Sequence, residues 1–537
     1  MNFYSIRLPV AGLLVPLLLA ACGGGGDSGG TVATATGSST AASSGGSSGP
    51  TYVPGQYLPA ANFAAKCASP RSGTDPVTNV PYPDVQGTGT DENYFLRSWT
   101  HQLYLWFADV PDLDPAQYST ADYFPLLKTS ATTASGAPVD RFHFTYATSV
   151  WESLSQEGEQ AGYGVDFEVI AATPPRQIVV AYLDPSASGA AATLARGTLI
   201  ESIDGVDAVN DDTSSGVATL NAGLQPSAAG QTHTFTVLDP GSSTPRTVQL
   251  LSTNVTQTPV PVATAVTANG GKVGYILFND HIATAEAELI SAFTSLQSQG
   301  VSDLVLDIRY NGGGYLDIAS EVAYMIAGAA QTGGRTFELQ QFNSQYPSLN
   351  PVTNATITPT LFHSTSQGFS VPSGQALPSL NLSRVFILTG TQTCSASESI
   401  INSLRGVNVQ VILVGSTTCG KPYGFYPQDN CGTTYFSIQL RGVNDQGFGD
   451  YPAGFSPGNT LDPAGVVIPG CSVADDFSHA LGDPAEAQFS EALAYRSGSV
   501  CTVQPSGSGI KLQTRPQGTG LAVTARSPLR DIKILRE

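Results

Sequence analysis

Charged residues are scarce in this chain. Asp, Glu, Lys and Arg make up only 12% of its 537 residues, and the formal net charge is −19. Nucleic acids and anionic lipid surfaces are bound through an excess of Lys and Arg, which this composition does not offer. We therefore expect no nucleic-acid partner.

Short motifs of metal, nucleotide and common hydrolase chemistry are also missing. There is no C-x-x-C pair and no H-E-x-x-H, so neither structural zinc nor a zinc peptidase is expected. The glycine-rich stretch at 311–314 lacks the G-K-[ST] step of a P-loop. "GFSPG" (Gly454–Gly458) fits G-x-S-x-G, but no strong strand precedes it, so Ser456 is predicted to be a loop residue. The six histidines are scattered, and we expect neither a metal nor a cofactor.

The N-terminus has the features of an export signal over residues 1–21. Arg7 is followed by an apolar segment that is too short for a comfortable membrane span. "LAAC" (Leu19–Cys22) resembles the lipobox of bacterial lipoproteins, which implies cleavage before Cys22 and lipid attachment to its sulfur. The alternative is an ordinary signal peptide with a chance cysteine. Gly23 favours the outer membrane, so we expect a lipid-anchored protein of the bacterial cell envelope, at its periplasmic face or on the cell surface.

Six further cysteines permit three disulfides in an exported protein, with fifteen possible connectivities. Pairing of Cys419 with Cys431 would close a short loop, and pairing of Cys67 with Cys501 would join the two ends. Both pairings are hypotheses.

Composition and periodicity divide the rest of the chain into five regions. In order these are a Gly/Ser-rich tether (22–55), a mainly helical N-terminal region (56–160), a β-rich unit (161–256), a region of alternating strands and helices (257–502) and a flexible tail (503–537). In the N-terminal region, Glu92–Phe107 has apolar residues at helical spacing. Alternation of strands and helices predicts an α/β fold with a mostly parallel sheet.

The β-rich unit resembles a PDZ domain. "GYGV" (Gly162, Tyr163, Gly164 and Val165) matches the carboxylate-binding loop, whose backbone N–H groups receive a peptide's C-terminus while the edge strand pairs with the peptide. An unrelated small β-barrel that only packs is the alternative.

A serine stands where a strand is expected to give way to a helix. "TCSASESI" (Thr393–Ile400) follows the apolar segment "RVFILTG" (Arg384–Gly390). Ser395 and Glu398 form the S-x-x-E pattern of a capping box, so a purely structural role for Ser395 is one interpretation. The other is that Ser395 is a nucleophile at the carboxyl edge of the sheet, where ligands bind in such folds.

Lysine occurs only six times, and between Thr129 and Ile510 only Lys272 and Lys421 are present. Lys421 follows the apolar segment "VQVILVG" and is expected at the same edge as Ser395. Burial would lower the pKa of such a lysine from ~10.4 toward ~7–8 and make it a general base. An exposed loop lysine is the alternative.

The triple glycine in "DIRYNGGGYLDIA" (Asp307–Ala319) lets backbone N–H groups approach a substrate closely. We expect the amides of Gly313 and Ala396 to stabilise an oxyanion, an effect worth ~3–4 kcal/mol per donor.

In their order and spacing, "GYILFND", "DLVLDIRYNGGGYLDIA", "CSASES" and "VGSTTCGKPYG" resemble the core motifs of the S41 serine peptidases, the C-terminal processing or tail-specific proteases. The resemblance spans about residues 162–495. It implies a crotonase-like (ClpP/crotonase-type) α/β core with a PDZ domain, and a serine endopeptidase acting on protein or peptide substrates with free C-termini. It also implies Ser395 as nucleophile, Lys421 as base and Gly313 and Ala396 as oxyanion donors.

The sequence departs from the family at one catalytic position. Many members carry Gln or Glu four residues after the lysine, where this chain has Phe425. Glu398 is the nearest replacement and Gln428 a weaker one. The cysteines that flank the serine and the lysine suggest disulfides that brace the site. A non-catalytic peptide- or ligand-binding protein on the same fold is the alternative function, and an esterase is a third.

Overall fold

The computed structural model describes residues 50–76, 79–133, 136, 138–268, 270–501, 521–524 and 533–535. Residues 52–537 form one compact unit, to which all the elements below belong. The predicted signal peptide, Cys22 and most of the predicted tether lie outside the described residues. Among those described, no helix has the length and apolar character needed to cross a membrane.

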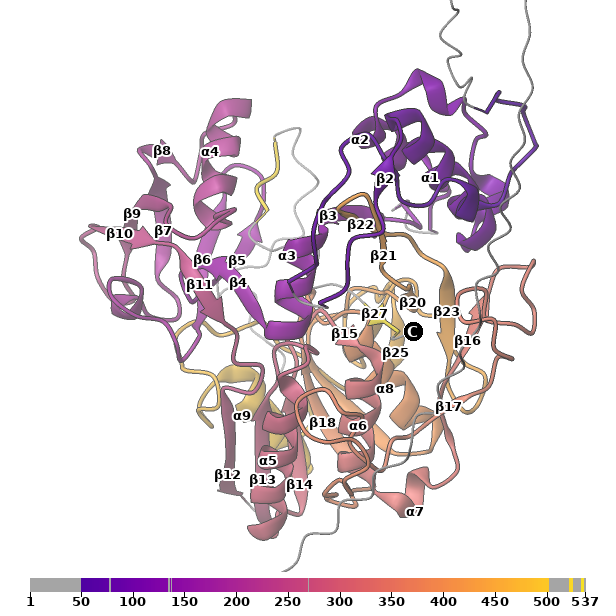
Figure 1. Cartoon of the computed structure of the whole chain (residues 1–537). Coiled ribbons are helices and arrows are strands. Elements are labelled where there is room, and N and C mark those ends of the chain that lie inside the picture. The colour runs from indigo at the N-terminus through magenta and orange to yellow at the C-terminus, as the bar shows by residue number, and fades with distance from the viewer. Residues whose placement is uncertain are drawn as a thin grey trace, which may run out of the picture. The chain divides into compact units, whose positions relative to one another are not determined.

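A six-stranded sheet forms the centre of the region predicted to alternate strands and helices (Figure 1). Its strands, in spatial order, are β12 (Val262–Ala268), β13 (Gly271–Leu277), β14 (Asp303–Asp307), β18 (Arg384–Thr389), β19 (Gln410–Gly415) and β26 (Gly470–Ser472). β12 is antiparallel to β13, and all later neighbours are parallel. The predicted mostly parallel sheet is confirmed.

Helices cover both faces of this sheet. They are α5 (Ala285–Ser298), α6 (Leu316–Ala327) and α8 (Ala396–Gly406) on one face and α9 (Ala487–Arg496) on the other. Successive strand residues point to opposite faces, so Ile276 joins the core beneath α5, α6 and α8, while its neighbour Tyr275 packs on Phe489 of α9. The predicted alternation of strands and helices is therefore confirmed.

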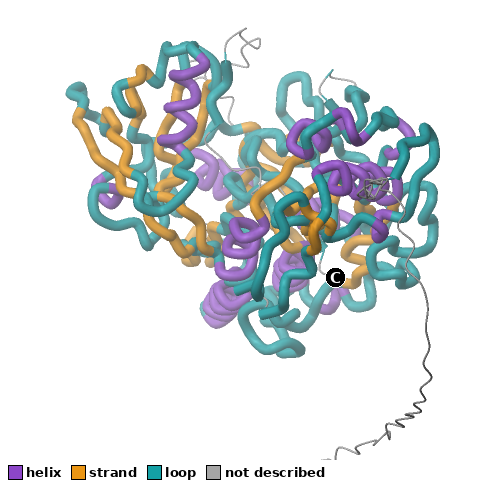
Figure 2. The backbone as a smooth tube through the Cα atoms, turned by 45° about the horizontal axis from the view of Figure 1, so that its top comes forward, coloured by secondary structure: helices purple, strands orange, loops and turns teal. Residues whose placement is uncertain are grey.

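The β-rich unit has a sheet and core of its own. Its strands are, in spatial order, β10 (Arg246–Leu251), β9 (Thr232–Leu238), β7 (Leu199–Ile203), β6 (Gln177–Leu183) and β5 (Val165–Ala171), with β8 (Val206–Asp207) beside β7. Figure 2 shows the helix α4 (Ser214–Leu224) packed on these strands. Phe167, Leu220 and Phe235 are buried between them. β5 lies at one edge of the sheet, and a separate pair, β4 (Glu159–Gly162) and β11 (Thr253–Thr256), joins the two ends of the unit.

The N-terminal region combines helices with short strands. They are α1 (Gly89–Leu103), α2 (Thr120–Tyr123), α3 (Thr148–Glu152), β1 (Lys66–Cys67), β2 (Val85–Gln86) and β3 (Phe144–Ala147). The predicted helix Glu92–Phe107 exists, but it begins earlier because Thr88 caps it by accepting the Asp91 N–H. It ends at Leu103 because Tyr104 is extended.

Further short strands and one helical turn complete this region of the chain. They are β15 (Gly314–Tyr315), α7 (Ala329–Thr332), β16 (Thr336–Phe342), β17 (Thr360–Leu361), β20 (Tyr423–Gly424), β21 (Gln428–Asn430), β22 (Thr433–Phe436), β23 (Leu440–Val443), β24 (Phe455–Pro457), β25 (Val466–Ile468) and β27 (Lys533–Ile534). The antiparallel strand β22 ends at Phe436, and at Ile438 the C=O accepts the Leu105 N–H instead of a ladder partner. β22 and β23 accordingly belong to different sheets.

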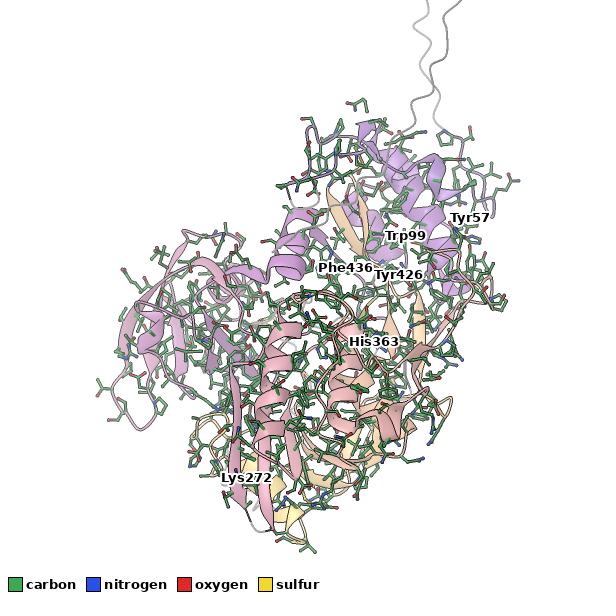
Figure 3. All side chains as sticks on the ribbon, turned by 60° about the horizontal axis from the view of Figure 1, so that its bottom comes forward. Tyr57, Trp99, Lys272, His363, Tyr426 and Phe436 are labelled. Atoms are coloured by element: carbon green, nitrogen blue, oxygen red, sulfur yellow. A yellow bond between two sulfur atoms is a disulfide. The ribbon has the colours of Figure 1, made fainter. Side chains whose placement is uncertain are left out.

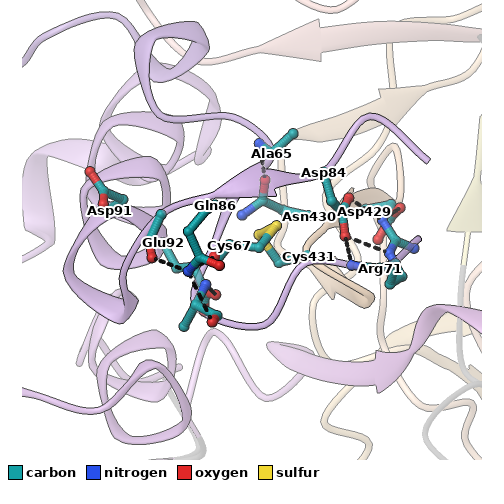
Figure 4. The surroundings of a disulfide bond; sticks show 12 residues. Ala65, Cys67, Arg71, Asp84, Gln86, Asp91, Glu92, Asp429, Asn430 and Cys431 are labelled. Atoms are coloured by element: carbon teal, nitrogen blue, oxygen red, sulfur yellow. Dashed lines mark hydrogen bonds and ion pairs between the residues drawn. A yellow bond between two sulfur atoms is a disulfide. The ribbon is translucent and has the colours of Figure 1, made fainter.

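Three disulfides join Cys67 to Cys431, Cys394 to Cys419 and Cys471 to Cys501. Both hypothetical pairings, Cys419 with Cys431 and Cys67 with Cys501, are therefore wrong. Long-range contacts decide the pairing, as Figure 4 shows around Cys67 and Cys431. There Ala65 N–H donates to Asn430 Oδ1 (2.8 Å), and Arg71 bridges Asp84 and Asp429 (2.9 Å each).

Each of the two described pieces of the tail contributes buried residues. Val523 is 3% exposed and joins the core of the β-rich unit, while Lys533 and Ile534 are 0% and 4% exposed. The expectation of a loosely attached tail is wrong for these residues, because their side chains are anchored in the interior. Most of 503–537 lies outside the described residues.

Candidate active site

Ser395 lies in a strained turn between β18 and α8. Its backbone has φ 59° and ψ −114°, a conformation that L residues seldom adopt and that costs of order 1–3 kcal/mol. A serine nucleophile on a sharp strand–turn–helix connection has this kind of geometry. Ser395 is fully buried, and within the described residues its Oγ has no hydrogen-bond partner.

Glu398 connects this turn to the loop that carries Lys421. Its Oε2 accepts the backbone N–H groups of both Ser395 (3.0 Å) and Lys421 (2.7 Å). Its Oε1 accepts the Gly420 N–H (2.8 Å) and the Thr418 hydroxyl (2.5 Å). Burial raises the pKa of Glu398, and these hydrogen bonds oppose the rise. The backbone N–H groups of Ser395 and Lys421 thus donate to the same oxygen of Glu398, which holds the two residues close together.

Lys421 is fully buried, so the interpretation as an exposed loop lysine is wrong. Its Nζ lies 4.4 Å from the ring centroid of Phe142 and 4.7 Å from that of Phe425. Phe425 therefore places an aromatic face against the amino group of Lys421. Lys272 is exposed, and Figure 3 places it at the end of the molecule remote from Phe436, which packs against Phe425.

The glycine turn after β14 contacts the start of α8. The C=O of Asn311 accepts the Cys394 N–H (3.1 Å) and the Ser397 hydroxyl (2.9 Å). The Gly313 N–H donates to Asn311 Oδ1 (3.0 Å), so this predicted oxyanion donor is engaged within the turn itself. Ala396 is the first residue of α8, and its N–H belongs to the donors that a helix start leaves unpaired.

His281 is a buried neighbour of this turn that the sequence pattern does not reveal. Its Nδ1 lies 2.9 Å from Asn311 Oδ1, and Asn311 Nδ2 donates to Phe278 O, so Oδ1 is the acceptor and His281 Nδ1 carries the proton. Burial lowers the pKa of His281 to about 3, so the ring is neutral. Gly314 has φ +136°, and a Cβ there would lie 2.4 Å from the His281 carbonyl oxygen, so only glycine fits. The contact between His281 and Asn311 bridges a long stretch of sequence and leaves no local signal.

The predicted peptide-binding turn Gly162–Val165 lines a pocket of the β-rich unit. Leu224 and Gln225, at the end of α4, line the same pocket. The Tyr163 hydroxyl donates to Gly223 O (2.9 Å), and Gly164 has φ +69°. This turn leads directly into the edge strand β5.

Ser456 lies in β24 and not in a loop as predicted, because its segment pairs with β25. It is buried, and its Oγ lies 2.9 Å from Thr417 Oγ1. Two groups of potential metal ligands occur among the described residues, namely Cys394, Glu398 and Cys419, and Cys471, Glu491 and Cys501. All four of their sulfurs are in disulfides, so neither group offers a thiolate.

Comparisons with known proteins find matches to S41 peptidases and C-terminal processing proteases. Residues 272–425 match the model of Peptidase family S41. The carboxyl-terminal-processing protease of Picosynechococcus sp. is 28% identical over 275 residues, which cover 50% of this chain and 56% of that protein. The chloroplastic C-terminal processing peptidase of Tetradesmus obliquus is 39% identical over 97 residues, which cover 16% of this chain and 21% of that protein. The match thus spans about half or less of the length of these curated relatives.

A solved structure from Bacteroides fragilis, whose description assigns it to the S41 proteases, has the same fold. The two structures superpose with a TM-score of 0.56 at 22% identity, and the match covers 78% of this chain and 98% of the other. At that identity the likeness shows the fold alone. The chain therefore matches the Peptidase family S41 model over residues 272–425 and is similar in fold to the Bacteroides fragilis structure.

Proposed function

We propose that this protein is a serine endopeptidase in which Ser395 is the nucleophile and Lys421 is the general base. The observation that carries the proposal is the shared acceptor Glu398 Oε2, which holds both main chains at the carboxyl edge of the central sheet. The strained turn at Ser395 and its buried Oγ support it. The family match over 272–425 supports the reaction class.

In the first step the neutral amine of Lys421 takes the proton of Ser395 Oγ, while Oγ bonds to the carbonyl carbon of a peptide. Lys421 is fully buried before this transfer. After it, the faces of Phe142 and Phe425 stabilise the cation. In this mechanism Phe425 contributes its ring face at the position where related sequences have an acceptor.

The tetrahedral intermediate carries an oxyanion, which the N–H of Ala396 stabilises at the start of α8. The Gly313 N–H becomes a second donor once it leaves Asn311 Oδ1. Collapse breaks the C–N bond, and Lys421 gives its proton to the departing amine. Water then attacks the acyl-serine ester and passes a proton to Lys421, which returns it to Ser395 Oγ as the acid leaves.

We also propose that Gly162–Val165 receives the free C-terminus of a protein substrate and that β5 pairs with its last residues. The pocket at this turn and the position of β5 at the sheet edge support this assignment. A lipid on Cys22 would hold the enzyme at the bacterial cell envelope. Loss of peptide binding on amidation of the peptide's terminus tests the first assignment, and mass spectrometry of the mature N-terminus tests the second.

A non-catalytic peptide-binding protein is the second candidate. The engaged Gly313 N–H and the aromatic Phe425 favour it, because both differ from a complete serine peptidase site. It predicts saturable peptide binding without turnover.

Cleavage of casein by the purified protein separates the two candidates. Ser395→Ala and Lys421→Ala should each abolish cleavage. Ser456→Ala and Lys272→Ala are the matched controls. Both should remain active, because Ser456 belongs to the other serine motif and Lys272 is an exposed lysine, and neither has a role in the proposed mechanism. Full activity of either site variant would overturn the proposal. A panel of small esters, run in parallel, identifies an esterase.

A further inference from the structure

A short strand of the C-terminal tail lies beside the glycine turn of the proposed active site. β27 runs parallel to β15, with Gly314 opposite Lys533 and Tyr315 opposite Ile534. On its other side the Phe425 N–H donates to Lys533 O (3.2 Å). Figure 1 shows β27, in yellow, beside β15 and β20. This segment therefore lies between the glycine turn and the loop that carries Lys421, in the conformation of a bound peptide.

The side chain of Lys533 enters a buried acidic pocket. It is fully buried, and its Nζ donates to Glu338 Oε2 (2.9 Å) and to Pro422 O (3.4 Å). The absence of a side chain at Gly424 makes room for its methylenes, since a Cβ there would lie 3.1 Å from Lys533 Cδ. The pocket therefore fits a long basic side chain.

Glu338 is placed to bind a positively charged side chain. It is 1% exposed on β16, and its Oε2 also accepts the hydroxyl of Ser399, one turn after Ser395 on α8 (3.0 Å). Its Oε1 is buried and has no hydrogen-bond partner within the described residues. A buried carboxylate without a cation is strongly disfavoured. Lys533 of the chain's own tail supplies the cation that pairs with this carboxylate.

A second piece of the same tail binds the β-rich unit. Val523 is buried in the core of that unit, and its N–H donates to Ala172 O (3.2 Å), directly after β5. The Thr524 N–H donates to Asn221 Oδ1 of α4 (2.9 Å). The tail therefore contacts the end of the edge strand and the helix that lies over the sheet.

We propose that the C-terminal tail is a built-in peptide ligand of the active site, and that the Glu338 pocket selects substrates with a lysine or arginine where the tail places Lys533. This inference rests on the proposed peptidase function for the identity of the site. Substrate must displace the tail, so the tail also limits access to Ser395.

A binding measurement tests this inference without turnover. The probe is a fluorescent peptide with the sequence of residues 530–537, and the protein is the full chain with Ser395→Ala, so the probe stays intact. Lys533→Glu in the chain should tighten probe binding by about tenfold or more, because repulsion by Glu338 releases the tail. Lys533→Met, which keeps the length without charge, should act in the same direction. Lys272→Glu is the matched charge control and should bind the probe as weakly as the parent.

The same assay tests the pocket. A probe with methionine in place of its lysine should bind the Lys533→Glu chain about tenfold more weakly or worse, and Glu338→Gln should remove most of this difference. Equal binding of both probes would overturn basic-side-chain selection. Equal binding of the lysine probe to the parent and to both Lys533 variants would overturn occupancy by the tail. Neither outcome depends on casein cleavage, so failure of the proposed function is recognised separately.

Discussion

Cys394 and Cys419 form a disulfide that joins the residue before Ser395 to the residue two positions before Lys421. The Cα atoms are 5.2 Å apart, and the bridge closes a loop with a sequence separation of 25. Together with the carboxylate of Glu398 it ties the start of α8 to the lysine loop by a covalent bond and by hydrogen bonds. This agrees with the expectation that disulfides brace the site.

Removal of this bridge by Cys394→Ser with Cys419→Ser should lower both stability and casein cleavage. We expect a loss of about 3 kcal/mol in the free energy of unfolding, because the unfolded chain without the bridge has more conformational entropy. The matched control is Cys471→Ser with Cys501→Ser, whose separation of 30 is similar. Urea unfolding should show similar losses for the two pairs. Cleavage, measured where both are folded, should fall only for the first pair, and equal cleavage would show that the bridge does not position the site.

Glu398→Gln should reduce cleavage through the positions of Ser395 and Lys421. An amide keeps only one acceptor oxygen, so one of the two sets of backbone N–H groups loses its partner, at a cost of about 1–3 kcal/mol. We expect kcat to fall at least tenfold with little change in KM, together with an altered pH profile of kcat. Thr418→Val removes one donor to the same carboxylate but keeps both shared N–H bonds. It should therefore lose less, and a loss equal to that of Glu398→Gln would argue against positioning by Oε2.

Arg309→Met should destabilise the fold strongly. Arg309 is 1% exposed and pairs with Asp307 (2.8 Å), Asp475 (2.7 Å) and Glu486 (2.7 Å). Its loss leaves buried carboxylates without a cation, and we expect about 3–5 kcal/mol less stability in urea unfolding. Arg335→Met, which breaks an ion pair at the surface, is the matched control and should have a much smaller effect. Similar midpoints for both variants would contradict this account.

Glu321→Gln should stabilise the protein above neutral pH. Burial, followed by the charge of Glu286, raises the pKa of Glu321 to about 9. The folded protein therefore holds a proton that the unfolded chain releases above about pH 4.5, so stability falls by up to about 1.4 kcal/mol per pH unit toward pH 9. Urea unfolding at pH 5, 7 and 8.5 should show a shallower decline for the variant. A parallel decline in both proteins would show that Glu321 does not titrate in this way.

Glu286 itself is held by its surroundings. Its carboxylate accepts the backbone N–H groups of five consecutive residues, 367–371. Burial alone would raise the pKa of Glu286, but these hydrogen bonds lower it. The charge therefore stays on Glu286, and the proton of the pair stays on Glu321.

The central sheet was predictable because its signals are local. An apolar strand such as β18 or β19, a small-residue turn and an amphipathic helix can each be identified from a few consecutive residues. Ser395 and Lys421 were predictable as site residues for the same reason, since each follows such a strand.

Contacts between distant segments were not predictable. The partner of Cys67 depends on how the N-terminal region packs on the loop near Cys431. His281 and Asn311 meet only when two strands pair, and Lys533 meets Glu338 only when the tail returns to the core. No periodicity in the sequence indicates these contacts, because they form only when distant segments pack together in the folded chain.

The bond between Cys67 and Cys431 spans a sequence separation of 364 and makes that part of the chain a closed ring. A single peptide-bond break anywhere inside the ring opens it without producing two separate molecules. The cut ends stay covalently attached through sulfur, and the N-terminal segment with Cys22 stays attached to the residues after Cys431. An internal nick would therefore leave the apparent mass on a non-reducing gel unchanged and appear only after reduction.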